Sequence, residues 1–255
     1  MNYKLNIGWL YPELMSTYGD RGNIICLKKR CEWRDIKIEI KKLDLGFKIY
    51  DLRSCDLIFM GGAQDKQQEI VSKDLNRGKM KALKEMIEEE IPGLYICGAY
   101  QFLGKYYKEA SGSIINGVGV FDLYTENPGE NKDRLIGNIV IESGVVAGSL
   151  PRCTLVGFEN HGGRTYLGAK TQPLGKVIKG FGNNGKDKTE GAIYKKSFGS
   201  YLHGPILPKN PHFTDYLIKL ALENKYKETI VLSGLDDSLE WQAHKTIAKR
   251  LAITI

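Results

Sequence analysis

Short apolar segments alternate with amphipathic segments along the first part of the chain. Residues 36–40 alternate strictly between apolar and charged side chains, which predicts a half-buried strand. Residues 57–60 are apolar throughout and end at two glycines, as in a strand covered on both faces of a parallel sheet. Further strands are predicted at 5–10 and 94–96, and helices at 24–35, 80–90 and 101–107.

The order of these segments predicts the fold class. Strands that alternate with helices indicate crossover connections, so we expect an α/β fold with a mostly parallel sheet flanked by helices on both faces. No linker-like composition divides the chain, and we expect one domain over residues 1–255.

The second part of the chain changes character after about residue 114. Glycines separate short predicted strands at 136–141, 154–158 and 192–195, so this section is expected to be β-rich. A strand-like segment at 198–202 then leads directly to His203. The remaining pattern predicts two helices, at 212–223 and 237–251.

The charge balance narrows the class of partner. The 255 residues carry a formal net charge of +7, but the lysines are scattered and often lie beside acids, as Lys84 does beside Glu85. No basic stripe is interleaved with aromatic residues, so we expect no nucleic-acid partner. An acidic substrate or an acidic partner surface explains the positive net charge equally well. No apolar run approaches membrane-spanning length, and residues 5–10 are too short for a signal peptide.

The cysteines indicate a reducing compartment. Their number is odd and their spacing irregular, which does not suit a secreted disulfide framework. We therefore expect a cytoplasmic protein, in which a reactive thiol persists. No Cys/His or carboxylate cluster has metal-ligand spacing, so no metal site is expected. The five cysteines are Cys26, Cys31, Cys55, Cys97 and Cys153.

Cys97 has the setting of a nucleophile. It follows a predicted buried strand and precedes Gly98 and a predicted helix, which is the arrangement of a nucleophile elbow. Such a turn exposes the sulfur at the carboxyl end of the sheet, and the helix N-terminus stabilises a thiolate. The alternative is a buried structural cysteine, and we assign that interpretation to the other four.

A thiol nucleophile needs a base, and the chain offers four histidines. His203 follows a predicted strand whose end can lie beside that of the strand before Cys97, so it is the first choice. His161, in a glycine-rich loop, is the second choice. His212 and His244 lie in predicted helices and are expected to be surface or packing residues.

Two segments carry a specific resemblance. Residues 96–104 (ICGAYQFLG) and 200–205 (SYLHGP) resemble the nucleophile and histidine segments of class I glutamine amidotransferases, in the branch that resembles cobyric acid synthases. The resemblance extends over nearly the whole chain and implies a flavodoxin-like α/β fold. Further matching segments are 10–15 (LYPELM), 18–23 (YGDRGN), 61–65 (GGAQD) and 159–165 (ENHGGRT).

The resemblance implies roles for individual residues. Cys97 would be the nucleophile and His203 its general base and acid. The N–H groups of Gly98 and of Gly61 or Gly62 would form the oxyanion hole. Residues expected to hold the glutamine substrate are Gln101 and Arg134.

Two features leave alternatives open. Lys132 and Arg152 lie near Arg134 in sequence and compete with it for the role of glutamine-binding cation. Many class I amidotransferases carry His-x-Glu, whereas here Pro205 follows His203 and Gly204. A histidine without an orienting carboxylate is a poorer base. We therefore expect the partner subunit to supply the acid or order the site, and the isolated chain to be weakly active. The loop 18–23 lacks a phosphate-binding pattern and is expected to shape the site or the partner contact.

The resemblance also implies the reaction and the partner. The chain would hydrolyse L-glutamine to glutamate and ammonia, with no cofactor of its own. The ammonia would pass to a MurT-like Mur ligase subunit, which uses ATP and Mg²⁺ to amidate D-glutamate of lipid II to D-isoglutamine during peptidoglycan synthesis. One alternative is a corrinoid or another carboxylate as acceptor. Another is a non-catalytic binding subunit that keeps the fold.

Overall fold

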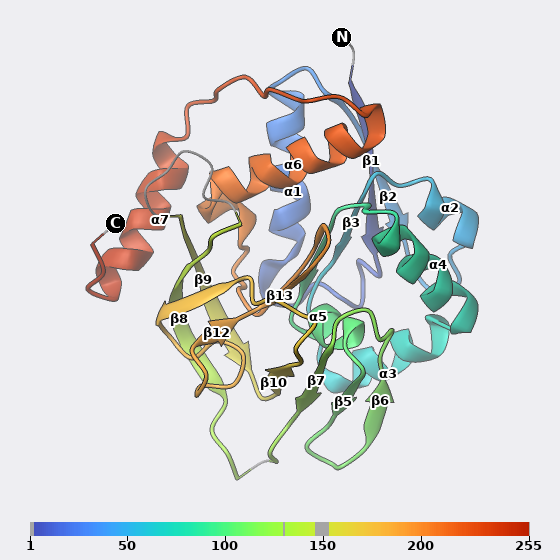
Figure 1. Cartoon of the computed structure of the whole chain (residues 1–255), viewed down its shortest axis with the longest axis vertical. Coiled ribbons are helices and arrows are strands. Elements are labelled where there is room, and N and C mark those ends of the chain that lie inside the picture. The colour runs from blue at the N-terminus through green and yellow to red at the C-terminus, as the bar shows by residue number, and fades with distance from the viewer. Residues whose placement is uncertain (1–2, 130, 146–152, 255) are drawn as a thin grey trace.

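The main sheet of the computed structural model has six strands, in the order β13-β14-β4-β3-β1-β2. Figure 1 shows three of them, β1, β2 and β3, side by side. The structure describes residues 3–129, 131–145 and 153–254. All neighbours in this sheet run parallel except β13, which pairs antiparallel with β14 at one edge. Its strands are β1 (Lys4–Leu10), β2 (Lys37–Leu43), β3 (Leu57–Met60), β4 (Gly93–Ile96), β13 (Ala192–Tyr194) and β14 (Ser197–Ser200).

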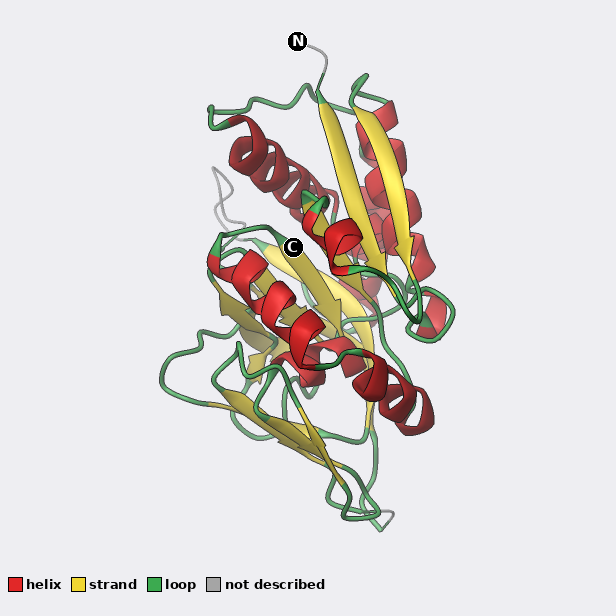
Figure 2. Ribbon diagram, turned by 90° about the vertical axis from the view of Figure 1, so that its right-hand side faces the viewer, coloured by secondary structure: helices red, strands yellow, loops and turns green. Residues whose placement is uncertain are grey.

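Helices lie on both sides of this sheet (Figure 2), so the predicted fold class is confirmed. β3 and β4 are buried along their whole length, which is why their sequences are uniformly apolar. The α-helices are α1 (Arg21–Glu32), α2 (Ile49–Arg53), α3 (Asp65–Asp74), α4 (Arg77–Glu88), α5 (Gly98–Leu103), α6 (Pro211–Tyr226) and α7 (Ser238–Arg250); two short 3-10 helices span Thr17–Gly19 (η1) and Leu207–Lys209 (η2).

The helix predictions were wrong in three places. α2 and α3 were not predicted, because α2 has five residues and α3 buries only Gln68 and Val71, which leaves no apolar stripe to recognise. The helix expected at 101–107 begins earlier, at Gly98, and ends at Leu103. Tyr106–Lys108 is a strand instead, which pairs with two neighbours in a second sheet.

The middle of the chain forms two further sheets, as its β-rich sequence predicts. One has the order β10-β7-β5-β6 and the other β12-β11-β8-β9. α7 packs on β8 and β9, where Ala248 joins Val140 and Val156 in a small apolar cluster. The strands are β5 (Tyr106–Lys108), β6 (Ile114–Asn116), β7 (Leu123–Glu126), β8 (Leu135–Glu142), β9 (Thr154–His161), β10 (Arg164–Leu167), β11 (Gly175–Lys179) and β12 (Thr189–Glu190).

The register of the main sheet brings three loops together. Met60 of β3 pairs with Tyr95 of β4, and Ile96 of β4 pairs with Ser200 of β14. These parallel strands end at the same edge of the sheet, so the residues that follow them, including Cys97 and His203, lie next to one another.

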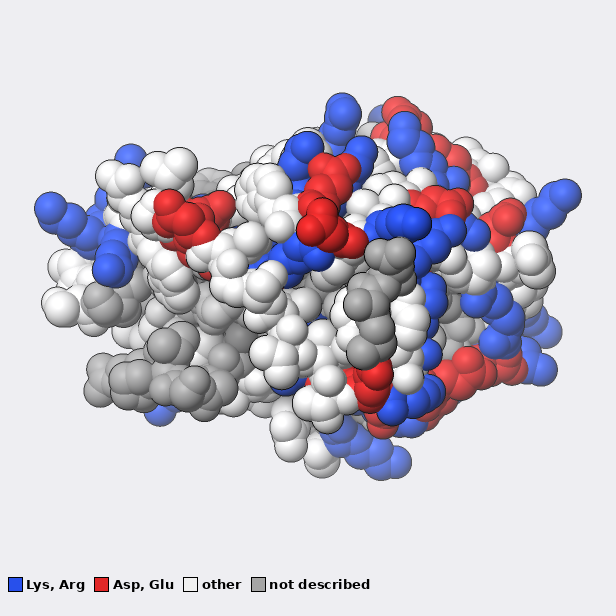
Figure 3. Space-filling view, turned by 90° about the horizontal axis from the view of Figure 1, so that it is seen from above, with Lys and Arg blue, Asp and Glu red and all other residues white. Residues whose placement is uncertain are grey.

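The surface charges are mixed on the face that Figure 3 shows, where lysine and arginine side chains are interspersed with acidic ones. Exposed ion pairs such as Lys4 with Glu39 and Lys28 with Glu32 reflect this mixing. Among the described residues, no helix combines the length and apolar character needed to cross a membrane.

A buried arginine of α1 connects this helix to the C-terminal helices α6 and α7. The Arg30 guanidinium of α1 is 1% exposed and bonds both Asp215 of α6 and Asp237, just before α7. Nε donates to Asp215 at 2.7 Å, and Arg34 donates to the same carboxylate at 2.7 Å. α1, α6 and the start of α7 are therefore connected through one cation.

We predict that Arg30→Ala lowers the free energy of unfolding by about 3 kcal/mol, because it removes the cation that pairs with Asp237 and leaves Asp215 with Arg34 alone. Both carboxylates keep some contact with water, which places the loss at the lower end of the range for buried pairs. Urea denaturation at neutral pH measures the change. Lys29→Ala removes an exposed cation one residue away and is expected to cost under about 0.5 kcal/mol. Equal losses in the two variants would contradict the assignment.

Candidate active site

Cys97 lies on the sharp turn between β4 and α5, as predicted. Its backbone has φ 52° and ψ −106°, a strained conformation for a residue with a side chain. The Cys97 N–H donates to the carbonyl oxygen of Ser200 at 2.8 Å, which ties the turn to the end of β14. Cys97 is only 9% exposed and is the N-cap residue of α5, at the end of the helix that attracts anions.

The structure brings His203 to the same place. His203 is buried and follows β14 by three residues, and its backbone exchanges hydrogen bonds of 2.7 and 3.2 Å with Phe158 of β9. A Cβ added to Gly62 would lie 2.8 Å from His203 Cε1 and 3.2 Å from Cys97 Cβ. The imidazole and the thiol-bearing side chain therefore meet over Gly62, where no side chain fits.

A third residue, Asp20, holds the other side of the imidazole. His203 Nδ1 donates to Asp20 Oδ1 at 3.3 Å, and the Gly62 N–H donates to Oδ2 at 2.7 Å. Burial lowers the pKa of His203, but the negative charge of Cys97 and hydrogen bonds to Asp20 and Cys97 outweigh it and raise the pKa to about 10. Nε2 has no other partner of regular hydrogen-bond geometry among the described residues, which leaves it for the sulfur.

The expectation that His203 lacks an orienting carboxylate was therefore wrong. The acid is not in the histidine segment but comes from the loop after β1, 183 residues earlier in the chain. The one available signal was a carboxylate among the turn formers of residues 18–23, just before α1. This loop contains a second residue of the site, because the Tyr18 ring packs edge-on against His203, with ring centroids 5.0 Å apart.

Burial disfavours the thiolate form of the other four cysteines. Burial raises the thiol pKa to about 11 for Cys26 and Cys153, and to about 12 for Cys31 and Cys55. A thiol with such a pKa is almost entirely protonated at neutral pH and is a poor nucleophile. The prediction that these four are structural agrees with their surroundings.

The expected oxyanion donors require one correction. The Gly62 N–H is directed to Asp20, so it is not available to an oxyanion in this structure. The N–H groups of Ala63 and Gly98 have no acceptor among the described residues. The Ala63 nitrogen lies 3.2 Å from the position of a Cβ on Gly98, so the two groups are adjacent. Gly61 contributes by close packing, since a Cβ there would lie 2.4 Å from the Met15 carbonyl oxygen.

A pocket of about 590 Å³ opens beside Cys97 and is lined by Gln101 and Arg134. Gln101 is buried, and both ends of its amide are engaged: Gln68 Nε2 donates to Oε1 at 3.3 Å, and Nε2 donates to the Tyr201 hydroxyl at 3.1 Å. The hydrogen bonds to Gln68 and Tyr201 therefore fix the Gln101 side chain in the wall of the pocket.

Arg134 is the arginine that the fold brings to this pocket. Its Nε and Nη2 donate to the side-chain and backbone oxygens of Asn160, each at 2.9 Å, so the guanidinium is held in place. Lys132 and Arg134 are both exposed, but Lys132 does not line the pocket. Arg152 lies outside the described residues.

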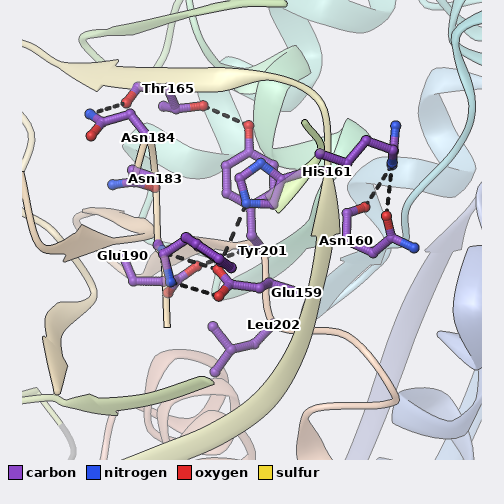
Figure 4. A network of polar contacts seen from close by, with 12 residues as sticks. Glu159, Asn160, His161, Thr165, Asn183, Asn184, Glu190, Tyr201 and Leu202 are labelled. Carbon is purple, nitrogen blue, oxygen red and sulfur yellow. Dashed lines mark hydrogen bonds and ion pairs between the residues drawn. The ribbon is translucent and has the colours of Figure 1, made fainter. Parts of the chain in front are cut away.

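His161 also lines the pocket, but the protein holds its ring in another way. The ring stacks on Tyr201 with centroids 3.6 Å apart, and Nδ1 donates to the Gly163 carbonyl oxygen at 2.8 Å. Nε2 lies 3.9 Å from a carboxylate oxygen of Glu159. Both side chains are labelled in Figure 4, where a dashed line joins them. Burial lowers the pKa of His161, so it is neutral at physiological pH. The described contacts couple His203, not His161, to Cys97.

The remaining histidines pack, as expected. His212 stacks on Trp241 with ring centroids 5.0 Å apart. His244 is buried, accepts from the Thr154 hydroxyl at 2.9 Å and donates to the Lys209 carbonyl oxygen at 2.8 Å. Neither residue approaches the pocket beside Cys97.

The sequence is also similar to those of known glutamine-hydrolysing proteins. The chain is 45% identical to the GatD subunit of the glutamine-hydrolysing lipid II isoglutaminyl synthase of Staphylococcus aureus, over 88% of this chain and 86% of that one. It is 42% identical to the subunit of the same name from Streptococcus pneumoniae, over 93% of this chain and 88% of that one.

A solved structure agrees in fold. The glutaminase domain of CTPS from Trypanosoma brucei superposes with a TM-score of 0.57, at 13% sequence identity, and the match covers 90% of this chain and 96% of that one. Residues 6–211 match the family model of the CobB/CobQ-like glutamine amidotransferase domain. The chain therefore belongs to the family of CobB/CobQ-like glutamine amidotransferases.

Proposed function

We propose that this chain is the glutaminase subunit of a lipid II isoglutaminyl synthase. It hydrolyses L-glutamine and passes ammonia to a MurT-like ligase subunit, which amidates D-glutamate of lipid II with ATP and Mg²⁺. The observation that carries the proposal is the buried Cys97–His203–Asp20 constellation at one end of a polar pocket. Similarity to GatD subunits over most of the chain supports lipid II, rather than a corrinoid, as the acceptor.

The first step is attack by the Cys97 thiolate on the side-chain carbonyl carbon of glutamine. His203, protonated and held by Asp20, stabilises the thiolate before the attack. The adjacent N–H groups of Ala63 and Gly98 bind the oxyanion of the tetrahedral intermediate. The Gly62 N–H does not contribute to the oxyanion hole, because it donates to the Asp20 carboxylate and holds it in place.

His203 then transfers its proton to the departing nitrogen, and ammonia leaves with a γ-glutamyl thioester on Cys97. The neutral imidazole activates water, which releases glutamate and restores the thiolate–imidazolium pair. Because the orienting carboxylate lies in this chain, the partner does not have to supply it. We therefore expect measurable glutamate release by the chain alone, with the ligase subunit receiving the ammonia.

This assignment leaves location and domain organisation as further parts of the proposal. All five cysteines are free thiols, which fits a reducing compartment such as the cytoplasm. We propose that residues 1–255 act as one glutaminase domain, because α6 and α7 are fastened to α1 through Arg30.

We predict that Asp20→Asn lowers kcat/KM for L-glutamine by roughly 10²- to 10⁴-fold, as for other histidines that lose their orienting carboxylate. The carboxylate contributes to the raised pKa of His203, so its loss lowers that pKa. The alkaline limb of the pH–rate profile, where the imidazolium is lost, moves to lower pH. The measurement is glutamate release between pH 6 and 10.

The matched control is Glu13→Gln, which removes an exposed carboxylate from the same loop. It is expected to leave both the rate and the pH profile unchanged. Thermal unfolding of both variants checks that the fold is retained. A folded Asp20→Asn variant with the wild-type profile would show that Asp20 does not orient His203.

The experiment for the whole proposal separates ammonia production from its use. The complex of this chain with a MurT-like subunit receives lipid II, ATP, Mg²⁺ and either L-glutamine or ammonium chloride. We predict that Cys97→Ser abolishes amidation from glutamine and leaves amidation from ammonium intact, since only the thiol is lost.

Cys153→Ser, at a buried cysteine away from the pocket, is the control and is expected to retain both reactions. Glutamine-dependent amidation that survives Cys97→Ser would refute the nucleophile. Wild-type complex that amidates lipid II from ammonium but never from glutamine would refute the glutaminase role.

A further inference from the structure

The charges that line the pocket beside Cys97 are unequally distributed. Among the described lining residues, Asp65 is the only carboxylate, whereas Arg134 and Lys66 are cations. Asp65 is half-buried at the first position of α3, two residues after Ala63 in the loop that follows β3. Asp65 takes part in none of the proposed steps at Cys97 and His203.

Two polar residues of the pocket lining, Tyr107 and Asn127, lie between Asp65 and Arg134. The Tyr107 hydroxyl donates to Asp65 Oδ1 at 3.2 Å, and the Asn127 side chain interacts with the same phenol. Asn127 Nδ2 and Arg134 Nη1 lie 2.9 and 3.4 Å from the position that a Cβ on Gly162 would take. The carboxylate and the guanidinium thus lie along one side of the pocket, with Tyr107 and Asn127 between them.

L-Glutamine has groups that match this arrangement. When its amide lies at Cys97, its Cα, three bonds away, carries an ammonium and a carboxylate group further out in the same pocket. A zwitterionic end requires an anion and a cation at separate points, and charge-assisted hydrogen bonds to each would fix its orientation. The D enantiomer would present its two charged groups in exchanged positions.

We propose that Asp65 recognises the α-ammonium group of L-glutamine, while Arg134 holds the α-carboxylate. The assignment rests on the proposed glutaminase function and adds a residue that determines substrate specificity. It makes the pocket selective for an L-α-amino acid amide over a simple ω-amide acid. A purely structural role is the competing explanation, because Asp65 also begins a helix and accepts from Tyr107.

Glutaramate is the analogue of glutamine without the α-amino group. The two explanations predict different effects of an Asp65 substitution on the activity with this compound. Ammonia release from L-glutamine and from glutaramate is measured for the complex with the ligase subunit. We predict that Asp65→Asn lowers kcat/KM for L-glutamine about 10- to 100-fold, mainly through KM. The value for glutaramate, or its inhibition constant against L-glutamine, changes by less than about threefold, since the lost contact is absent there.

Two further variants make the test specific. Asp65→Glu keeps the charge and is expected to restore part of the preference for L-glutamine. Glu69→Gln removes an exposed carboxylate from the same helix, outside the pocket lining, and is expected to change neither substrate. Arg134→Gln is expected to reduce discrimination against 4-aminobutanamide, which lacks the carboxylate, but not against glutaramate.

Equal losses for L-glutamine and glutaramate in Asp65→Asn, or no loss for either, would overturn the assignment while the wild-type activity stands. A wild-type complex that releases ammonia from neither compound would instead refute the glutaminase function on which it rests. Thermal unfolding of Asp65→Asn distinguishes a folding defect from the loss of one contact. A folding defect lowers the activity with both substrates.

Discussion

The carboxylate of Asp20 connects the parts of the site that the sheet alone does not fix. One oxygen accepts from His203 and the other from the N–H of Gly62, so the loop after β1, the loop after β3 and the segment after β14 share one buried anion. A buried carboxylate is stable only with such partners, because its desolvation is costly when it is unpaired. The charge that orients the imidazole therefore also holds the loop beside the nucleophile in place.

The remaining geometry follows from strain at Cys97. A residue with φ 52° and ψ −106° persists only where its surroundings determine it. Here the hydrogen bond to Ser200 and the close packing of Gly62 on the Cys97 side chain do so. The resulting turn directs the sulfur away from the sheet, toward a pocket that is polar along one side. The three loops, the strained turn and the pocket thus form one unit rather than separate features.

The sequence predicted the elements whose side chains have a clear period or a buried, uniformly apolar run. The strands 57–60 and 94–96, the helix of residues 80–90 and the turn at Cys97 are of this kind. α3 was not predicted because it buries only two residues, so its sequence shows no apolar stripe with the helical period. Asp20 was missed because its role depends on a contact across 183 positions that no local pattern encodes. We expected an oxyanion donor from Gly61 or Gly62, and Gly62 fails for the same reason, since only the fold reveals that its N–H already has an acceptor.

Selective alkylation by 6-diazo-5-oxo-L-norleucine, an electrophile with the shape of glutamine, followed by peptide mass spectrometry, tests most directly whether Cys97 is the nucleophile. We predict one adduct, on Cys97, that excess L-glutamine prevents, while Cys26, Cys31, Cys55 and Cys153 remain unmodified. Modification of those four at rates comparable to Cys97, or labelling of Cys97 that L-glutamine does not slow, would contradict it.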